Sequence, residues 1–147
     1  MTVSDAPYQG HFIGREHHFA VRVYFEDTDF SGLVYHASYL RFMERARSDM
    51  LTCAGIIQSD AYVAGEGVYA VAELAIRYRK PAKFDDALLI VSTVDQVRAA
   101  SCVIHQRVML SGELLTDATV TAAFLSPQGR PKRQPRPWTR AFEKLLP

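Results

Sequence analysis

The fold is decided by one stretch of sequence, ASYLRFMERARSDMLTCA, which covers residues 37–54. Its apolar residues recur at steps of three and four, which is the period of an amphipathic helix. They are Tyr39, Phe42, Met43, Ala46, Met50, Cys53 and Ala54. Charged and hydroxyl side chains fill much of the opposite side, and Gly55 follows as a helix stop. We expect one long helix from about Ala37 to Ala54, with its apolar stripe in the core.

The residues after this helix change to the pattern of β-strands. Strand-like segments rich in Val, Ile, Leu, Thr and Ala cover residues 68–79, 86–98, 101–110 and 113–125. Ser111-Gly112 and Ala99-Ala100 predict tight reversals between them. Before the helix, residues 18–26 alternate apolar and polar side chains and predict a further strand. Residues 1–16 show no period, so we expect a loose lead-in there.

One strand, one long helix and four more strands predict an α+β fold in which an antiparallel sheet of about five strands curves around the helix. The sequence does not alternate strands with helices, which disfavours a doubly wound parallel sheet. Such a curved sheet keeps open edges, and pairing with a second copy would protect them, so we expect a homo-oligomer. We expect a single domain over residues 1–147, with a core at about 17–125 and a tail at 126–147.

Composition narrows the class of protein. A hydrophobic content of 48% and a charged content of 22% are those of an ordinary soluble globular chain. No apolar run approaches the roughly 20 residues that span a bilayer, and Met1–Asp5 does not resemble a secretory signal. Cys53 and Cys102 lack any motif spacing, which indicates reduced thiols and a cytoplasmic protein. No cluster of residues has metal-ligand spacing, so we expect no metal.

The C-terminal segment is basic and rich in proline. Residues 126–147 hold six Lys and Arg residues against one Glu, a net charge of +5, which leaves −4 for residues 1–125. A solvated, proline-stiffened extension is the favoured interpretation, and attraction of a phosphate-bearing partner is the alternative. Because the rest of the chain is acidic and contains no recognition module, we do not expect nucleic-acid binding.

A candidate site lies where the turn before the helix meets its first residues. Asp29 stands seven residues before His36 and belongs to the turn DTDFSG at 27–32, and the helix starts at about His36. A helix N-terminus offers unpaired N–H groups that keep a carboxylate ionised and polarise a carbonyl. A base or nucleophile beside such a group suits acyl transfer. The residues alone leave open that Asp27 and Asp29 only cap the turn and the helix.

The same region carries a family resemblance. The run VRVYFEDTDFSGLVYHASYL at residues 21–40, continued by FMERAR at 42–47, resembles the hotdog-fold acyl-CoA thioesterases of the 4-hydroxybenzoyl-CoA thioesterase family. Its EDTD, VYHASY and ERAR pieces are most similar to the branch associated with the Tol–Pal system, and a looser likeness covers most of residues 20–125. The resemblance implies hydrolysis of acyl-CoA, a helix wrapped by an antiparallel sheet, and a tetramer built from dimers.

The resemblance also implies roles for single residues. Asp29 corresponds to the catalytic carboxylate, and His36 to a functional histidine whose backbone N–H polarises the substrate carbonyl. The branch often has tyrosine where this chain has Phe25, so a hydroxyl that orients substrate or water is missing. We expect Phe25, Tyr35 and Glu44 to contact the substrate, although a local ion pair within the helix would also account for Glu44.

Coenzyme A is expected as part of the substrate, and no cofactor is expected. Its phosphates need cations, and Arg79, Lys80 and Lys83 gather with Arg77 near one strand end. Basic residues in that place also oppose edge-to-edge pairing of strands, which is the alternative. Glu73 is a reserve candidate for the catalytic carboxylate, because another branch of thioesterases uses a glutamate on this strand.

Two other functions stay open at this point. A hydratase or dehydratase uses the same fold, with a histidine and an acid across a long acyl tunnel. A non-catalytic protein that holds acyl carrier protein or lipid-synthesis enzymes through its basic tail is the second alternative. The presence of both Asp29 and His36 favours an enzyme over a non-catalytic protein, while the basic tail keeps the partner interpretation open.

Overall fold

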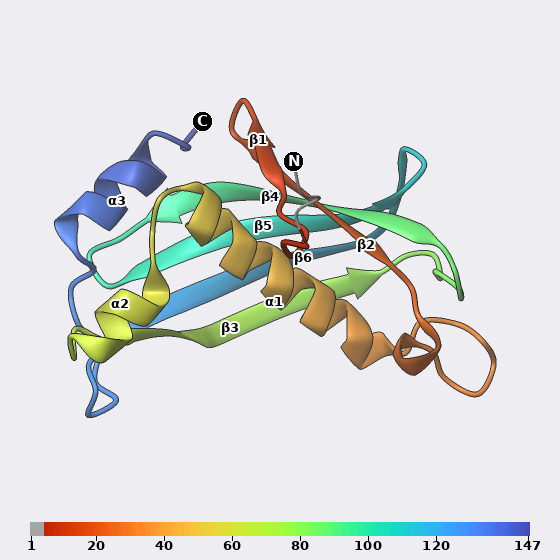
Figure 1. The fold of residues 1–147 in the computed structure, drawn as a ribbon, viewed down its shortest axis with the longest axis horizontal. Coiled ribbons are helices and arrows are strands. Elements are labelled where there is room, and N and C mark those ends of the chain that lie inside the picture. Colours follow the sequence, from red (N-terminus) through yellow and green to blue (C-terminus); the bar gives the residue numbers. More distant parts are fainter. Residues whose placement is uncertain (1–4) are drawn as a thin grey trace.

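The chain forms one antiparallel sheet of six strands with a long helix against its concave face (Figure 1). The computed structural model describes residues 5–147. The elements in chain order are β1 (His11–Ile13), β2 (Glu16–Arg22), the 3₁₀ turn η1 (Phe25–Asp27), α1 (His36–Cys53), α2 (Gln58–Val63), β3 (Val68–Tyr78), β4 (Ala87–Val97), β5 (Ser101–Leu110), β6 (Glu113–Leu125) and α3 (Arg136–Glu143). The strands lie in the order β1-β2-β4-β5-β6-β3, so β1 and β3 are the edges. The α+β hotdog arrangement expected from the sequence is confirmed.

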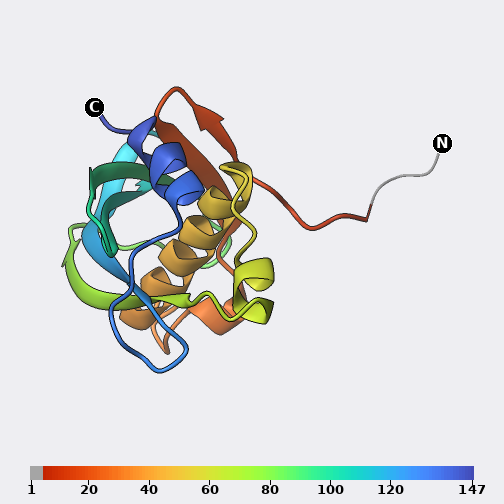
Figure 2. The ribbon, with the colours of Figure 1, turned by 90° about the vertical axis from the view of Figure 1, so that its left-hand side faces the viewer.

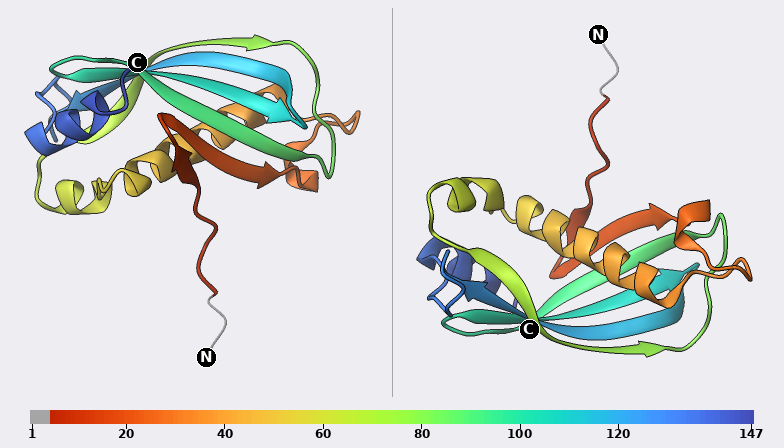
Figure 3. Two further views of the ribbon diagram at one scale, coloured as in Figure 1. Left: turned by 90° about the horizontal axis from the view of Figure 1, so that it is seen from above. Right: turned by 90° about the horizontal axis from the view of Figure 1, so that it is seen from below.

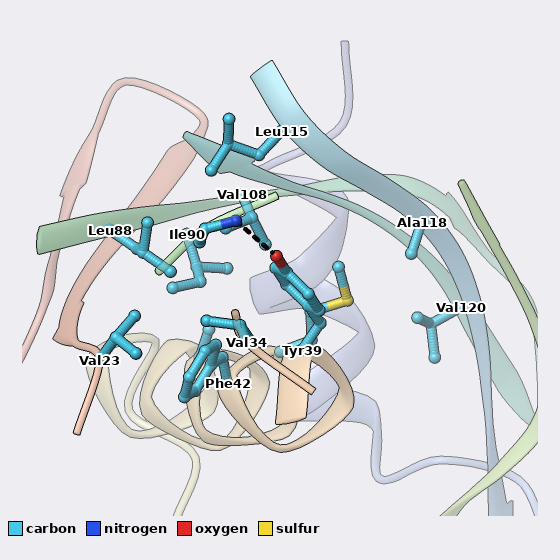
Figure 4. Packing of buried hydrophobic residues seen from close by; sticks show 13 residues of the cluster. Val23, Val34, Tyr39, Phe42, Leu88, Ile90, Val108, Leu115, Ala118 and Val120 are labelled. Atoms are coloured by element: carbon cyan, nitrogen blue, oxygen red, sulfur yellow. Dashed lines mark hydrogen bonds between the residues drawn. The ribbon is translucent and has the colours of Figure 1, made fainter. Parts of the chain in front are cut away.

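Helix α1 is held by the apolar stripe that the sequence predicts. Tyr39, Phe42, Met43, Ala46 and Met50 are each at most 3% exposed. They pack against side chains that point inward from β4, β5 and β6 (Figure 4). Figure 2 shows the sheet curving around α1, and Figure 3 shows the β1–β2 hairpin lying beside it. The helix is therefore enclosed along much of its length, which fixes where its first residues emerge.

Two polar side chains in this core, Tyr39 and Gln106, form hydrogen bonds to groups beside them. The hydroxyl oxygen of Tyr39 accepts a hydrogen bond of 3.0 Å from the N–H of Ala82 (Figure 4). The fully buried Gln106 donates 3.0 Å to the carbonyl of Met43 and accepts 3.0 Å from Arg47. Buried polar groups are tolerated when they are paired in this way, and each pair also fixes the position of α1.

The N-terminal half differs from the sequence expectation in three places. Strand β1 pairs with β2 within the expected loose lead-in, so the sheet has six strands and not about five. The strand expected at residues 18–26 ends at Arg22, because the Asp27 carboxylate accepts 2.8 Å from the N–H of Tyr24 and closes η1. Helix α2 forms within residues 56–67, where the sequence pattern indicates only an irregular link between the long helix and the next strand. All three features are too short for a periodic pattern to show.

The C-terminal segment is not the solvated extension that its composition predicts. Phe142 of α3 is 1% exposed and joins a second core cluster with Met50, Leu51 and Ile104. Trp138 packs edge-on against Phe124 with ring centroids 5.6 Å apart. Apolar side chains in the tail therefore extend the core beyond residue 125, while its basic side chains face outward.

The strand connections and thiols follow the sequence more closely. Ser111 and Gly112 have φ angles of 47° and 82°, the left-handed pair that a two-residue hairpin needs. Arg98 and Ser101 close the β4–β5 reversal with a 2.8 Å backbone bond. Cys53 and Cys102 are both free. Among residues 5–147, no helix combines the length and apolar character needed to cross a bilayer.

A carboxylate joins the N-terminal hairpin to α1. One oxygen of Asp49 accepts 2.7 Å from Nε2 of His17 and 2.9 Å from the N–H of Gly10. Burial lowers the pKa of His17, so the ring is neutral and donates from Nε2. A Cβ at position 10 would lie 2.8 Å from the same oxygen, so the close approach depends on glycine.

Replacing this carboxylate should destabilise the fold. Asp49→Ala leaves two buried N–H donors without an acceptor, and we expect it to lower the free energy of unfolding by about 2–4 kcal/mol. Urea unfolding at neutral pH measures the change. Asp95→Ala, at an exposed position of β4, is the control. Equal losses in the two variants would show that the Asp49 contacts contribute nothing.

Candidate active site

The turn that carries Asp29 folds back on itself. The N–H of Asp29 donates 2.8 Å to the carbonyl of Leu33, and Thr28 bridges Val34 across the turn. The carbonyl of Asp27 accepts 2.9 Å from the N–H of Tyr35 and 2.9 Å from the buried Ser38 hydroxyl. The turn is thus bonded directly to the first turn of α1.

Ser31 holds the Asp29 carboxylate. One carboxylate oxygen accepts 2.8 Å from the N–H of Ser31 and 2.5 Å from its hydroxyl. The hydroxyl bond, followed by the backbone bond, lowers the pKa of Asp29 below its ordinary value of 3.8. The exposed carboxylate is therefore ionised at neutral pH. The sequence predicts this ionisation, but the main cause in the structure is Ser31 and not the helix amides.

The N-terminus of α1 is open. Tyr35 occupies the cap position with an extended backbone, and its side chain makes no capping bond. No acidic residue lies in the first turn of the helix. The N–H groups of His36 and Ala37 precede the first hydrogen-bonded turn, so the helix itself offers them no acceptor. This end of the helix can donate to an oxygen that carries developing negative charge.

Aromatic rings surround His36. Its ring lies 4.4 Å from that of Tyr35 and 6.4 Å from that of Tyr78, measured between centroids. The Tyr78 hydroxyl donates 2.9 Å to the carbonyl of His36, which ties the end of β3 to the start of α1. Tyr39 continues this wall, with its ring edge-on to Tyr78 at 5.5 Å.

These groups meet in one open cleft of about 340 Å³. Four of the residues expected from the sequence line it: Asp29, His36, Arg79 and Lys80. The carboxylate and the helix N-terminus thus share one solvent-accessible space. The two cations are not free, because Arg79 pairs with Asp117 at 3.1 Å and Lys80 with Glu113 at 2.8 Å.

The other expected residues lie elsewhere. Tyr35 does not line the cleft, although its ring packs against that of His36, which does. Phe25 is 82% exposed and contacts the ring of Phe84. Lys83 follows the cleft-lining segment but does not line the cleft.

Two carboxylates named from the sequence are also outside the cleft. Glu44 is eight residues further along α1 than His36, about 12 Å along the axis, and accepts 3.1 Å from Ser48. It lines a separate cavity of about 150 Å³ between α1 and β3. Glu73 is exposed on the edge strand β3.

Sequence reasoning missed Tyr78, Tyr39 and the role of Ser31. The sequence predicts that Tyr39 is a core residue, and the structure confirms this. Tyr39 also lines the cleft, which the sequence does not indicate. Tyr78 is 42 residues from His36 in the chain, and no local pattern joins them. Ser31 had a usable signal, because a serine two residues after an aspartate commonly bonds to it in a turn.

One group of potential metal ligands lies apart from the cleft. Ligand atoms of His17, Asp49 and Cys53 are all within 4.8 Å of one another. The Cys53 thiol contacts the Asp49 carboxylate at 3.4 Å, and burial raises the thiol pKa. These residues bond to one another and to Gly10, so we assign them to the packing of the hairpin on α1.

The sequence is similar to a known family and to curated proteins. Residues 31–116 match the model of the family described as Thioesterase superfamily. The acyl-CoA thioesterase YbgC of Haemophilus influenzae is 42% identical over 105 residues, 71% of this chain and 77% of that protein. The acyl-CoA thioester hydrolase YbgC of Escherichia coli O6:H1 is 36% identical over 126 residues, 84% of this chain and 93% of that protein. The family resemblance expected from residues 21–47 is confirmed.

Solved structures give the same architecture. A probable thioesterase from Bartonella henselae has a TM-score of 0.79 and 34% identity, and the match covers 82% of this chain and 99% of that one. A 1,4-dihydroxy-2-naphthoyl-CoA thioesterase from Synechocystis has a TM-score of 0.80 at 23% identity, over 86% of this chain and 95% of that one. The second likeness supports the fold alone.

The contact between Ser31 and Asp29 can be tested directly. Ser31→Ala removes the hydroxyl bond but keeps the backbone one, so the pKa of Asp29 should rise toward 3.8 without passing far above it. A titration that follows the Asp29 carboxyl carbon by NMR measures the shift. Ser59→Ala, in α2, should leave the titration unchanged. An unaltered pKa in Ser31→Ala would contradict the assigned cause.

Proposed function

We propose that this chain, which belongs to the thioesterase superfamily, hydrolyses acyl-CoA to a free acid and coenzyme A in the cleft that Asp29 and His36 share. The observation that carries the proposal is that an ionised carboxylate and the open N-terminus of α1 line the same cleft. Thioester hydrolysis needs both, because one group must activate the attacking oxygen while another stabilises the carbonyl oxygen.

The carbonyl oxygen of the thioester is placed against the helix N-terminus, where it accepts from the N–H of His36. Asp29 takes a proton from water, and the oxygen of that water attacks the carbonyl carbon. The tetrahedral intermediate collapses with cleavage of the C–S bond, and the departing thiolate takes up a proton. Direct attack by Asp29 is the alternative, which gives a mixed anhydride that water then opens.

His36 has a second role through its ring. The ring is exposed at the cleft between Tyr35 and Tyr78, where it can place the water or protonate the departing thiolate. The bond from Tyr78 to the carbonyl of His36 keeps the first residue of α1 in place. Tyr78 is therefore a positioning residue in this proposal.

Oligomerisation accompanies the proposed activity. Strand β3 has 11 residues and pairs on only one side, with β6. Val68, Val71 and Tyr78 are between 41% and 50% exposed along it. A long apolar edge of this kind is protected when a second copy pairs with it, which supports a dimer as the unit of the expected tetramer. We place the enzyme in the cytoplasm, in keeping with its two free thiols.

Removal of the carboxylate should abolish most of the activity. Asp29→Ala is expected to lower kcat by about 10²–10⁴, the range for a positioned acid–base group. Release of free thiol from acyl-CoA measures the rate. Glu73→Ala is the matched control, since Glu73 is an exposed carboxylate outside the cleft, and it should keep its rate. A folded Asp29→Ala variant with normal turnover, or a loss confined to Glu73→Ala, would refute the assignment.

The cations of the cleft should affect binding and not turnover. Lys80→Gln is expected to raise KM for acyl-CoA about two- to fivefold with kcat unchanged, because an exposed charge contact contributes little free energy. Lys83→Gln is the control just outside the cleft. If both variants shift KM equally, the contact is general attraction and not a contact within the cleft.

A further inference from the structure

The C-terminal helix and the β4–β5 reversal enclose a second hollow, of about 480 Å³. Four arginines line it: Arg98, Arg133, Arg136 and Arg140. The hollow lies at the end of the molecule where α3 is seen in Figure 1, whereas the thioester cleft lies at the opposite end of α1. No residue lines both sites, so the hollow is separate from the thioester cleft.

The arginines come from separate parts of the chain. Arg98 follows β4, Arg133 precedes α3, and Arg136 and Arg140 are one turn apart on α3. A basic stretch of sequence alone does not produce this arrangement, because Arg98 is supplied by the sheet. The convergence is a property of the fold.

No acidic side chain among the described residues forms an ion pair with these guanidinium groups. Arg79 and Arg107, by contrast, do form ion pairs. Arg98 donates 2.7 Å to the neutral Gln96. Glu143 also lines the hollow, so four arginines and one glutamate give the lining a net charge of +3. The four arginines are exposed, so solvent screens their mutual repulsion, but the positive lining still attracts anions.

The wall of the hollow is fixed by buried hydrogen bonds. Gln134 is 5% exposed, and its side-chain amide donates 2.7 Å to the carbonyl of Arg98 and 3.1 Å to that of Ser101. Its backbone N–H donates 2.8 Å to Ala99. Its side-chain oxygen accepts 2.5 Å from the Tyr69 hydroxyl. The segment that carries Arg133 is thereby attached to the end of β4 that carries Arg98.

We propose that this hollow is an anion site that binds the phosphate or diphosphate group of a small molecule. Arginine presents a planar fork that matches phosphate oxygens, and a phosphate monoester carries about two negative charges at neutral pH. A multiply charged anion balances a lining of +3, which a single carboxylate does not. The phosphate belongs either to acyl-CoA bound at the cleft of another subunit or to a separate phosphorylated molecule.

The first test is direct binding of inorganic pyrophosphate, measured by calorimetry on the full chain. Arg136→Gln/Arg140→Gln should weaken binding about tenfold or more, since each lost bond to a charged group is costly. Arg130→Gln/Lys144→Gln removes the same charge from the same tail outside the hollow and should change binding less than twofold. Since α3 packs through Trp138 and Phe142, both variants should keep the melting temperature.

The second test separates the two sources of phosphate. A rise in KM for acyl-CoA in Arg136→Gln/Arg140→Gln, with no rise for the matching acyl-pantetheine, assigns the site to the phosphates of the substrate. Unchanged KM for both substrates, together with lost pyrophosphate binding, assigns it to a separate phosphorylated ligand. Absence of pyrophosphate binding in the unaltered protein, or equal weakening in both double variants, overturns the proposal. Neither binding result depends on the role of Asp29.

Discussion

Burial of one face of α1 in the concave side of the sheet is the constraint on which the rest of the structure depends. The helix has one apolar stripe, and the sheet has one face that needs covering, so each element supplies what the other lacks. The buried hydrogen bonds of Tyr39 and Gln106 fix the rotation of α1 about its own axis and its distance from the sheet. The first residue of α1 therefore emerges at one defined place.

The chemistry follows from that placement. A helix N-terminus is ordinarily capped by a side chain, and here Tyr35 leaves it uncapped while Asp27 and Ser38 attach the neighbouring turn to it. Asp29 bonds to Ser31 instead of to the helix, so the carboxylate and the helix amides stay separate and both remain available. The chain belongs to the thioesterase superfamily, and hydrolysis of a thioester needs a base together with a group that stabilises the carbonyl oxygen.

Local patterns in the sequence predict the elements, and long-range placement accounts for what they miss. The spacing of Tyr39, Phe42 and Met43 predicts the buried face of α1, because apolar residues at helical spacing lie on one face and that face packs in the core. The turn between Asp29 and His36 is local too, so its place beside the helix start follows from the sequence. Tyr78 reaches His36 only because β3 returns along the helix.

Charge shows the same limit of local reasoning. The sequence shows Arg79 and Lys80 in a group of basic residues and gives no sign of acidic partners. In the folded sheet, the strand register brings Asp117 and Glu113 beside them. The composition of residues 126–147 predicts a solvated extension, because charged residues and prolines outnumber the few apolar residues that pack against the sheet. Strand β1 has three residues, which is below the length at which alternation can be recognised.

The amide of Gln134 limits how this end of the protein can vary. Its amide donates two hydrogen bonds on one side and accepts one on the other within a buried space, and only asparagine, which is one methylene shorter, offers the same groups. Glutamate would face two carbonyl oxygens with negative charge, and leucine would leave carbonyl and hydroxyl groups unpaired. Substitution of Gln134 would therefore weaken the attachment of the C-terminal segment to the sheet, and glutamate there would also add a negative charge beside the four arginines of the hollow.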